Sequence, residues 1–285
     1  MSDYLVDNIN LDDPQGRWVV LRDTTLPRTG APRLATVEVP GREGIAALAA
    51  NGGGAGGVTL KFAITDRDAQ GQATRSRSQL WTNYELLLTV LKPRELVTLT
   101  MQPGGDAAKV RQVQARMSNA LAPAYQGHVS GRSIITLEVV YETLGFWEAP
   151  THVEYSITGI GTGKTVDLSA FSGATGWAAV SMIFTTPTEM VTVTDPVSGL
   201  TARWRRALTT WQSNPTNFLR LDLTDFDAGF VSSDAGWAED GVNVTMGLDV
   251  PASGFRLRPT PGVGSYRIYV AGAASALLRV RKTYL

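Results

Sequence analysis

Residues 154–168 read EYSITGIGTGKTVDL, and the glycine-rich centre TGIGTGKT decides between two kinds of fold. A phosphate-binding loop needs the spacing G-x-x-x-x-G-K-[ST], so that backbone N–H groups wrap the phosphates and the lysine reaches their oxygens. Gly163, Lys164 and Thr165 match the second half, but Thr158 stands where the first glycine is required. Such a loop also leads directly into a helix. The flanks instead alternate as two β-strands, and we expect no nucleotide site; the alternating residues are Val153, Tyr155, Ile157, Val166, Leu168 and Ala170.

The bulk composition excludes several classes of function. The chain has 285 residues, which suggests about two domains, and 43% of them are hydrophobic, enough for a packed core. It has no cysteine, which excludes disulfides, thiolate catalysis and cysteine-ligated zinc. There are 15 basic and 15 acidic residues before Pro150, and 11 of each after it. Nucleic-acid-binding proteins usually have a basic bias, so we expect no sequence-specific contact with nucleic acid, although a local basic patch stays compatible.

The N-terminal stretch MSDYLVDNINLDDP is acidic and lacks the apolar run of a signal peptide. No segment approaches the roughly 20 apolar residues that a membrane helix needs. We therefore expect a protein that is soluble where it is made, with no membrane insertion.

The first half reads as β-strands around a single helix. Residues 77–91, RSQLWTNYELLLTVL, repeat apolar side chains at helical spacing before Pro93, which predicts one helix. The predicted buried stripe is Leu80, Tyr84, Leu87, Leu88 and Leu91. Strands are predicted at 17–21, 34–39, 58–65, 95–101, 109–117 and 132–147, with helix as the alternative for 109–117. The glycine run 51–57 is interpreted as a surface loop.

From Thr151 onward we find no convincing helix. Short alternating segments are separated by explicit turns such as DPVSG (195–199), a pattern that indicates a β-sandwich. The composition changes near Glu148–Thr151. We predict a mainly β chain with domains at 1–149 and 150–285. The strands of the second domain are predicted at 152–157, 165–171, 177–186, 189–194, 200–208, 217–223, 242–250, 254–259, 265–271 and 276–285.

Residues capable of catalysis or metal binding are sparse. His128 and His152 both lie in polar, turn-like surroundings, without the spacing of a histidine metal site or a nucleophile elbow to serve. The segment LDLTDFDAG (221–229) places Asp222, Asp225 and Asp227 close together, as Ca²⁺ ligands would be, but departs from the calcium-loop pattern. We interpret it as an exposed strand end and turn. We expect no catalytic residue, no metal and no cofactor.

The second half is rich in tryptophan, which is either core or a stacking surface for sugars: Trp177, Trp204, Trp211 and Trp237. We take Trp211, Trp237, Asp225 and Asp227 as candidate glycan or partner contacts. Charges are also segregated here. Residues 222–249 carry seven acids and no bases, and residues 256–282 carry six bases and no acids. These stretches either pair across a sheet or form complementary surfaces for self-assembly.

The order of these parts resembles the distal tail proteins of long-tailed bacteriophages with non-contractile tails, often described as minor tail proteins. EVPGREG (38–44) is similar to a turn near the start of that family, and LLLTVLKPRELVTLTM (86–101) to its helix-then-strand step. The closing strands of its ring-forming domain resemble VQARMSNALAP (113–123) and GRSIITLEVVYETLGFWEAP (131–150). Residues 254–285 resemble the last hairpin of its galectin-like domain. The chain departs from the family at the glycine run 51–57 and at PTPGVG (259–264), which affects loop shape.

The resemblance implies a structural virion protein without catalysis. The N-terminal domain would form a homohexameric ring around a DNA-conducting channel, and the galectin-like sandwich would project outward. The implied partners are the tail tube protein, the tape-measure protein and the tail-tip protein, at the distal end of a tail made in the host cytoplasm. Candidate subunit-interface residues are Pro40, Gly41, Arg42 and Gly44.

Two other classes stay open. A carbohydrate-binding sandwich would use tryptophan and aspartate side chains to hold host cell-wall sugars. A glycoside hydrolase would need two carboxyl groups facing one cleft near Asp222–Asp227, which a sequence does not show.

Overall fold

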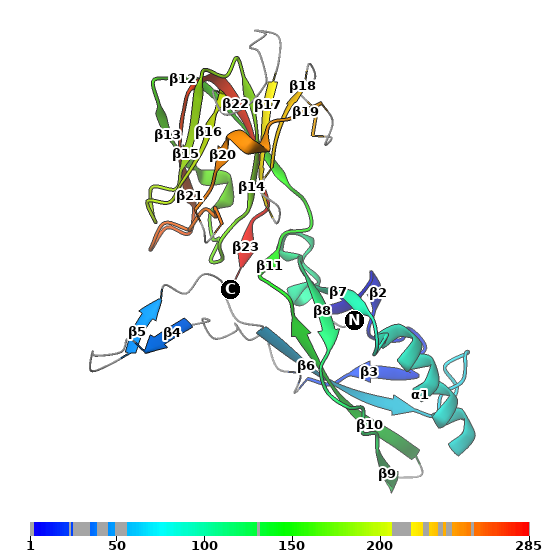
Figure 1. The fold of residues 1–285 in the computed structure, drawn as a ribbon. Helices are drawn as coiled ribbons and strands as arrows, with labels where there is room; N and C mark the ends of the chain where they lie inside the picture. The colour runs from blue at the N-terminus through cyan, green and yellow to red at the C-terminus, as the bar shows by residue number, and fades with distance from the viewer. Residues whose placement is uncertain are drawn as a thin grey trace. The chain divides into compact units, whose positions relative to one another are not determined.

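The computed structural model describes residues 3–22, 24, 35–38, 45–48, 56–129, 132–206, 218–224, 228–232, 236–237, 241–251 and 254–284. This part of the chain is mainly β with one α-helix, which confirms the predicted fold class. The chain divides into two compact units, one formed by Met1–Trp147 with Leu285 and one by Glu148–Tyr284 (Figure 1). Each unit is described in turn.

The first unit is built on an antiparallel sheet with the strand order β2-β1-β7-β8-β10-β6-β3, and β9 also pairs with β10. The bounds are β1 (Tyr4–Val6), β2 (Ile9–Asn10), β3 (Trp18–Val20), β6 (Gly56–Thr65), β7 (Leu96–Met101), β8 (Arg111–Met117), β9 (Ala124–Val129) and β10 (Arg132–Thr143). A separate antiparallel pair consists of β4 (Ala35–Glu38) and β5 (Ile45–Leu48). Two 3-10 turns, η1 (Pro103–Gly105) and η2 (Ala107–Lys109), precede β8, and β11 (Trp147–Glu148) follows β10.

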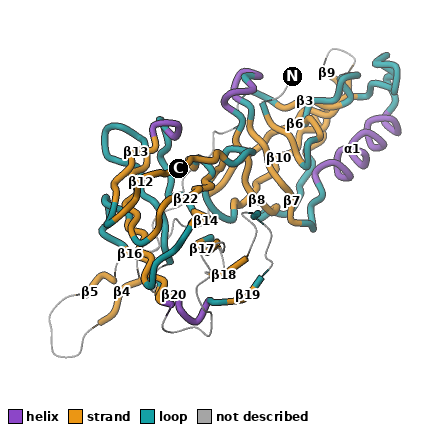
Figure 2. The backbone as a smooth tube through the Cα atoms, turned by 90° about the horizontal axis from the view of Figure 1, so that it is seen from above, coloured by secondary structure: helices purple, strands orange, loops and turns teal. Residues whose placement is uncertain are grey.

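The helix α1 (Arg77–Leu91) lies along β6 and β10 (Figure 2). Ser76 caps its N-terminus by accepting a hydrogen bond from Gln79 N, as serine commonly does. The predicted bounds are confirmed, but the predicted stripe is partly wrong. The buried side chains are Leu80, Asn83, Leu87 and Leu91, whereas Tyr84 and Leu88 are half-buried.

Asn83 explains this difference. Its side chain is fully buried, and Nδ2 donates to Thr65 O at 2.8 Å and to Arg67 O at 2.7 Å. These carbonyls belong to the last residue of β6 and to a residue just beyond it. Since buried carbonyls need a donor, the helix presents a polar side chain at a position where the apolar pattern had none.

The first two strands were not predicted, although their turn has a sequence signal. Asp7 and Asn8 join β1 to β2 with φ values of +46° and +68°. Positive φ at both central residues is the geometry of a type I′ hairpin turn, which favours aspartate, asparagine and glycine.

The second unit is a sandwich of two antiparallel sheets. One has the order β12-β22-β14-β17-β18-β19 and the other β13-β21-β15-β16-β20, and their inner faces form one apolar core. The bounds are β12 (Val153–Gly161), β13 (Lys164–Leu168), β14 (Val180–Thr185), β15 (Met190–Thr194), β16 (Thr201–Arg205), β17 (Phe218–Leu223), β18 (Ala228–Ser232), β19 (Val242–Asn243), β20 (Leu248–Asp249), β21 (Tyr266–Ala271), β22 (Ala273–Val280) and β23 (Thr283–Tyr284).

The glycine-rich stretch 158–165 is the corner at which a strand ribbon passes from one sheet to the other. β12 pairs with β22 in the six-stranded sheet, whereas β13 pairs with β21 in the five-stranded sheet. The prediction of two strands is confirmed, but they do not form a hairpin with each other. A register shift between Thr158 and Gly161, within the corner, interrupts the pairing of β12 with β22, as is typical of strands that switch sheets.

Close packing at this corner accounts for its glycines. Gly163 has φ +147°, and a Cβ atom there would lie 2.0 Å from Tyr269 Oη. Gly272, which joins β21 to β22, has φ +89°, and a Cβ atom there would lie 1.9 Å from Met190 O. Lys164 Nζ donates to Thr158 O at 2.7 Å, so the lysine of the apparent phosphate motif bonds within its own loop.

Three predicted strands are corrected. Segment 242–250 is broken by η5 (Thr245–Gly247), because Val244 O accepts from the buried Trp204 indole at 3.2 Å instead of from a neighbouring strand. Segment 254–259 makes isolated bridges, Ala178 with Leu257 and Pro259 with Tyr266. Segment 165–171 ends as η3 (Ser169–Phe171), which buries Phe171.

Candidate binding face of the second unit

The structure describes one of the four predicted glycan or partner contacts. Trp237 is described, whereas Trp211, Asp225 and Asp227 lie outside the described residues, as do the predicted interface residues Pro40, Gly41, Arg42 and Gly44. Trp204 is fully buried and belongs to the core.

Trp237 lies against the outer face of the six-stranded sheet. Side chains alternate between the faces of a strand, and the register aligns a polar row across four strands. In this row Glu154 of β12 is opposite Arg279 of β22, Arg279 is opposite Ser181 of β14, and Ser181 is opposite Asp222 of β17. Ser181 Oγ and Asp222 Oδ1 are 3.1 Å apart and share a hydrogen bond.

Three contacts hold Trp237 on this face. Its indole Nε1 donates to Glu154 Oε1 at 2.8 Å, and its carbonyl accepts from the Arg220 guanidinium at 2.7 Å. The guanidinium carbon of Arg279 lies 5.4 Å from the indole ring centroid, within the range of a cation–π contact. Arg220 is 4% exposed and also stacks on Phe230 at 4.9 Å. The loop residue is therefore fixed by the sheet beneath it.

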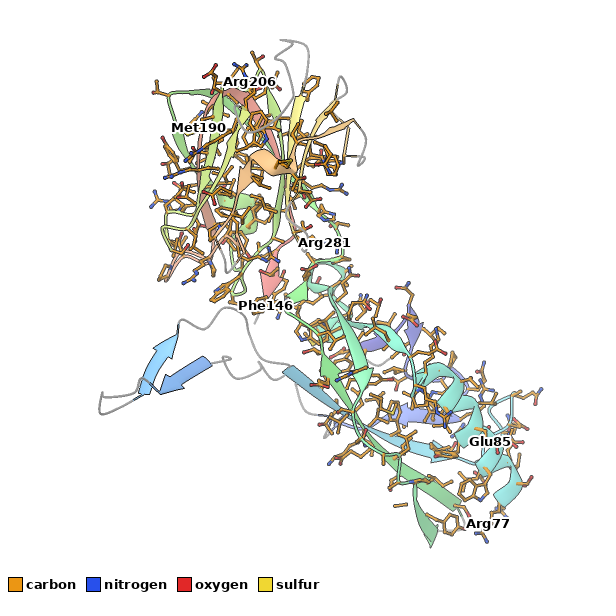
Figure 3. All side chains as sticks on the ribbon, in the orientation of Figure 1. Arg77, Glu85, Phe146, Met190, Arg206 and Arg281 are labelled. Atoms are coloured by element: carbon orange, nitrogen blue, oxygen red, sulfur yellow. The ribbon has the colours of Figure 1, made fainter. Side chains whose placement is uncertain are left out.

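The end of this face carries a histidine in a positive field. Val153 pairs with Val280, which places His152 opposite Arg281. Figure 3 labels Arg281 at one end of the sandwich, with Met190 and Arg206 toward the other. Partial desolvation of the exposed His152 ring, then Arg281 and Arg279, lowers the pKa of His152 to about 4, while Glu154 and Asp222 oppose the shift. His152 is therefore neutral at pH 7.

The six basic residues of 256–282 are not confined to one sheet, since Arg267 lies on β21 and Arg279 on β22. Arg267 on β21 pairs with Asp167 at 2.6 Å, and Arg281 pairs with Glu148 at 3.3 Å. Neither acid belongs to the acid-rich stretch 222–249, so these two ion pairs do not join the two charged stretches. Arg258 stacks on Trp177 at 4.5 Å.

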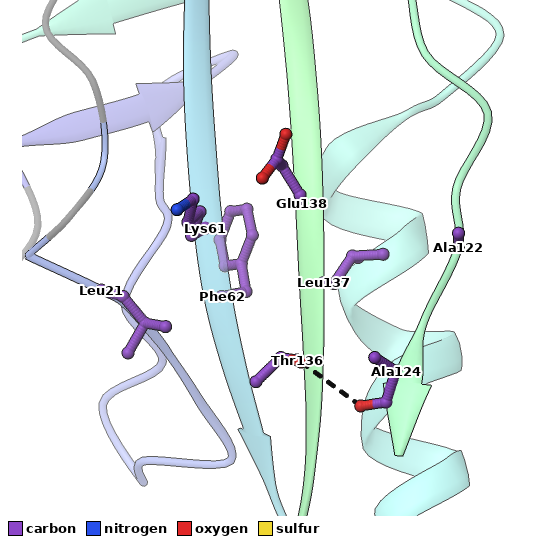
Figure 4. A pocket seen from close by; sticks show the side chains of 8 residues that line it. All are labelled: Leu21, Lys61, Phe62, Ala122, Ala124, Thr136, Leu137 and Glu138. Carbon is purple, nitrogen blue, oxygen red and sulfur yellow. Dashed lines mark hydrogen bonds between the residues drawn. The ribbon is translucent and has the colours of Figure 1, made fainter. Parts of the chain in front are cut away.

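The first unit has an open pocket of about 330 Å³ beside β6 and β10 (Figure 4). Lys61 and Glu138 are opposite each other in the register, and Thr136 Oγ1 donates to Ala124 O at 3.3 Å. The lining combines one acid, one base, one threonine and apolar side chains, and we assign it no chemistry. The other lining residues are Leu21, Phe62, Ala122 and Leu137.

Within the described ranges, no group of three histidine, aspartate or glutamate side chains is placed to hold a metal ion. No helix there is both long and apolar enough to cross a membrane.

No family model matches the sequence, and no curated protein does. Among solved structures, the chain is similar to the Dit protein of phage SPP1, described as a paradigm of the hub adsorption apparatus in phages that infect Gram-positive bacteria. The likeness covers 99% of each chain, with 13% sequence identity and a TM-score of 0.51. The two proteins share a fold, which supports the predicted resemblance at that level.

Proposed function

We propose that this chain is a distal tail hub protein of a long-tailed bacteriophage. The observation that carries the proposal is the fold shared with the SPP1 hub protein over nearly the whole of both chains. A likeness confined to the sandwich would fit many binding modules, because one fold serves many functions. A likeness that spans both units is more specific.

In this proposal the first unit forms a homohexameric ring around a channel that conducts DNA. The second unit is a galectin-like sandwich that projects from the ring. The ring connects the tail tube protein to the tape-measure and tail-tip proteins at the distal end of the virion, and the chain is not an enzyme. A net charge of zero fits a conduit, since strong attraction to phosphates would retard passing DNA.

The turn PGREG, residues 40–44, is the proposed contact between subunits. It connects β4 to β5, which pair in register from Ala35 with Leu48 to Glu38 with Ile45. We propose that Arg42 pairs with an acid of a neighbouring subunit.

Native mass spectrometry and negative-stain microscopy of the full chain test the proposal. We expect a hexamer or paired hexamers, and we expect Arg42→Glu to weaken assembly while each subunit stays folded. The matched control is Arg267→Glu, which breaks an ion pair on the second unit and should leave the ring intact. A persistent monomer at assembly concentrations would contradict the ring, and an unchanged ring in R42E would remove Arg42 from the interface.

Carbohydrate binding is the second candidate, because Trp237 is half-buried beside Glu154 and Arg279 on one sheet face. Its indole N–H already bonds Glu154, so a sugar would have to stack on the ring without that donor. A monomer that binds cell-wall glycans and loses them in Trp237→Ala would favour this candidate over the hub.

A further inference from the structure

Glu154 and Arg279 are opposite each other in the register of β12 and β22, yet they do not form an ion pair. Opposite charges at such positions normally attract across the strands. Here both side chains interact with Trp237 instead. The indole Nε1–H donates a hydrogen bond to the Glu154 carboxylate at 2.8 Å, and the Arg279 guanidinium carbon lies 5.4 Å from the indole ring centroid. The arginine is thereby positioned without an acidic partner.

The guanidinium of Arg279 consequently keeps its hydrogen-bonding capacity. Among the described residues, no hydrogen bond or ion pair involves the side chain of Arg279, and its Nε is buried without an acceptor. The side chain is half-buried, and stacking on Trp237 restricts its plane. Its terminal N–H groups form a planar fork, the geometry that binds two oxygens of one oxyanion.

Arg281 adds a second positive charge to the same face. It lies two residues after Arg279, just beyond the end of β22 and opposite His152, and makes one long bond of 3.3 Å to Glu148. His152 is exposed and neutral at pH 7 and can donate one ring N–H. Three acids limit the field: Glu148 pairs with Arg281, Glu154 is bonded to Trp237, and Asp222 is bonded to Ser181.

We propose that Arg279, Arg281 and His152 form a binding site for a tetrahedral oxyanion group, as carried by a phosphate or sulfate ester. Two guanidinium groups favour a doubly charged anion over a carboxylate. The site does not depend on whether the chain forms a ring, since all its residues belong to the second unit.

The chain has two histidines, so the NMR spectrum of a histidine-labelled sample contains ring signals from two residues. The signals that remain in His128→Gln are those of His152. We would measure the His152 pKa with sodium sulfate and with sodium chloride at equal ionic strength. Sulfate keeps both charges through the acid range. We expect sulfate to raise the His152 pKa from about 4 by about one unit, because a bound anion offsets the field of both arginines.

Three variants make the result specific. Arg279→Gln should abolish the sulfate-dependent shift, and Arg279→Lys, which keeps the charge without the fork, should reduce it. Arg267→Gln, on the other sheet, should leave it unchanged. Equal His152 pKa values in sulfate and chloride, or a full shift in R279Q, would overturn the site.

Titration calorimetry at pH 7 with phosphate, sulfate and acetate then identifies the group that binds. Tightest binding of acetate would contradict the preference for a tetrahedral anion.

Discussion

Asp7 occupies the turn between β1 and β2, and its carboxylate joins that turn to two other segments of the first unit. Oδ2 accepts from Lys92 Nζ at 2.7 Å, and Oδ1 accepts from Thr98 N at 2.8 Å. The bond from Lys92, then the bond from Thr98, hold the pKa of this carboxyl below its usual value. The unfolded chain therefore takes up this proton at a higher pH than the folded chain does. The contribution of Asp7 to stability is complete above the unfolded pKa, about 3.9, and is lost as the pH falls through the lower folded value.

Asp7→Asn tests this linkage, because asparagine adopts the same positive φ but carries no charge. We expect D7N to be less stable than the wild type in urea at pH 5 to 7, by a modest and constant amount. The difference should shrink as the pH falls below about 4. Lys92→Met should reproduce the loss at neutral pH. A difference that is independent of pH down to the acid transition would show that the charge of Asp7 does not contribute.

At the scale of elements, the corner of the strand ribbon depends on Gly163. Its φ of +147° is a backbone conformation that side chains rarely adopt, and Tyr269 occupies the space that a Cβ would take. We expect Gly163→Ala to lower the free energy of unfolding by about 2–3 kcal/mol. Gly159 in the same loop is the matched control, because it has φ +64° with nothing within 4 Å of a Cβ. Gly159→Ala should cost about 1 kcal/mol, and equal losses in urea unfolding would contradict the steric contact at Gly163.

These elements also show what a sequence predicts and what it leaves out. Alternation on both sides of TGIGTGKT predicted the strands of the corner correctly, because the period of two is a local signal. It did not predict that β12 and β13 enter different sheets, since their partners β22 and β21 come about a hundred residues later. The burial of Asn83 was not predicted, because the helical pattern was read from apolar residues and asparagine is polar. Trp237 was predicted as a contact from its residue type. Its neighbours Glu154 and Arg279 were not predicted, because they are brought together by the pairing of β12 with β22, which are far apart in the sequence.

At the scale of the whole molecule, the question is whether the two units unfold separately. Their cores are built from different segments, and the sequence predicts domains at 1–149 and 150–285. Asp7 contacts residues of the first unit and Gly163 those of the second, so D7N and G163A report on different units. If the units are independent domains, calorimetry at fixed protein concentration should show two transitions. G163A should lower the transition of the second unit by roughly 5–10 °C and leave that of the first unit in place. D7N should lower only the transition of the first unit. A single transition that both variants lower would mean that the chain unfolds as one cooperative unit, and the domain prediction would then be wrong.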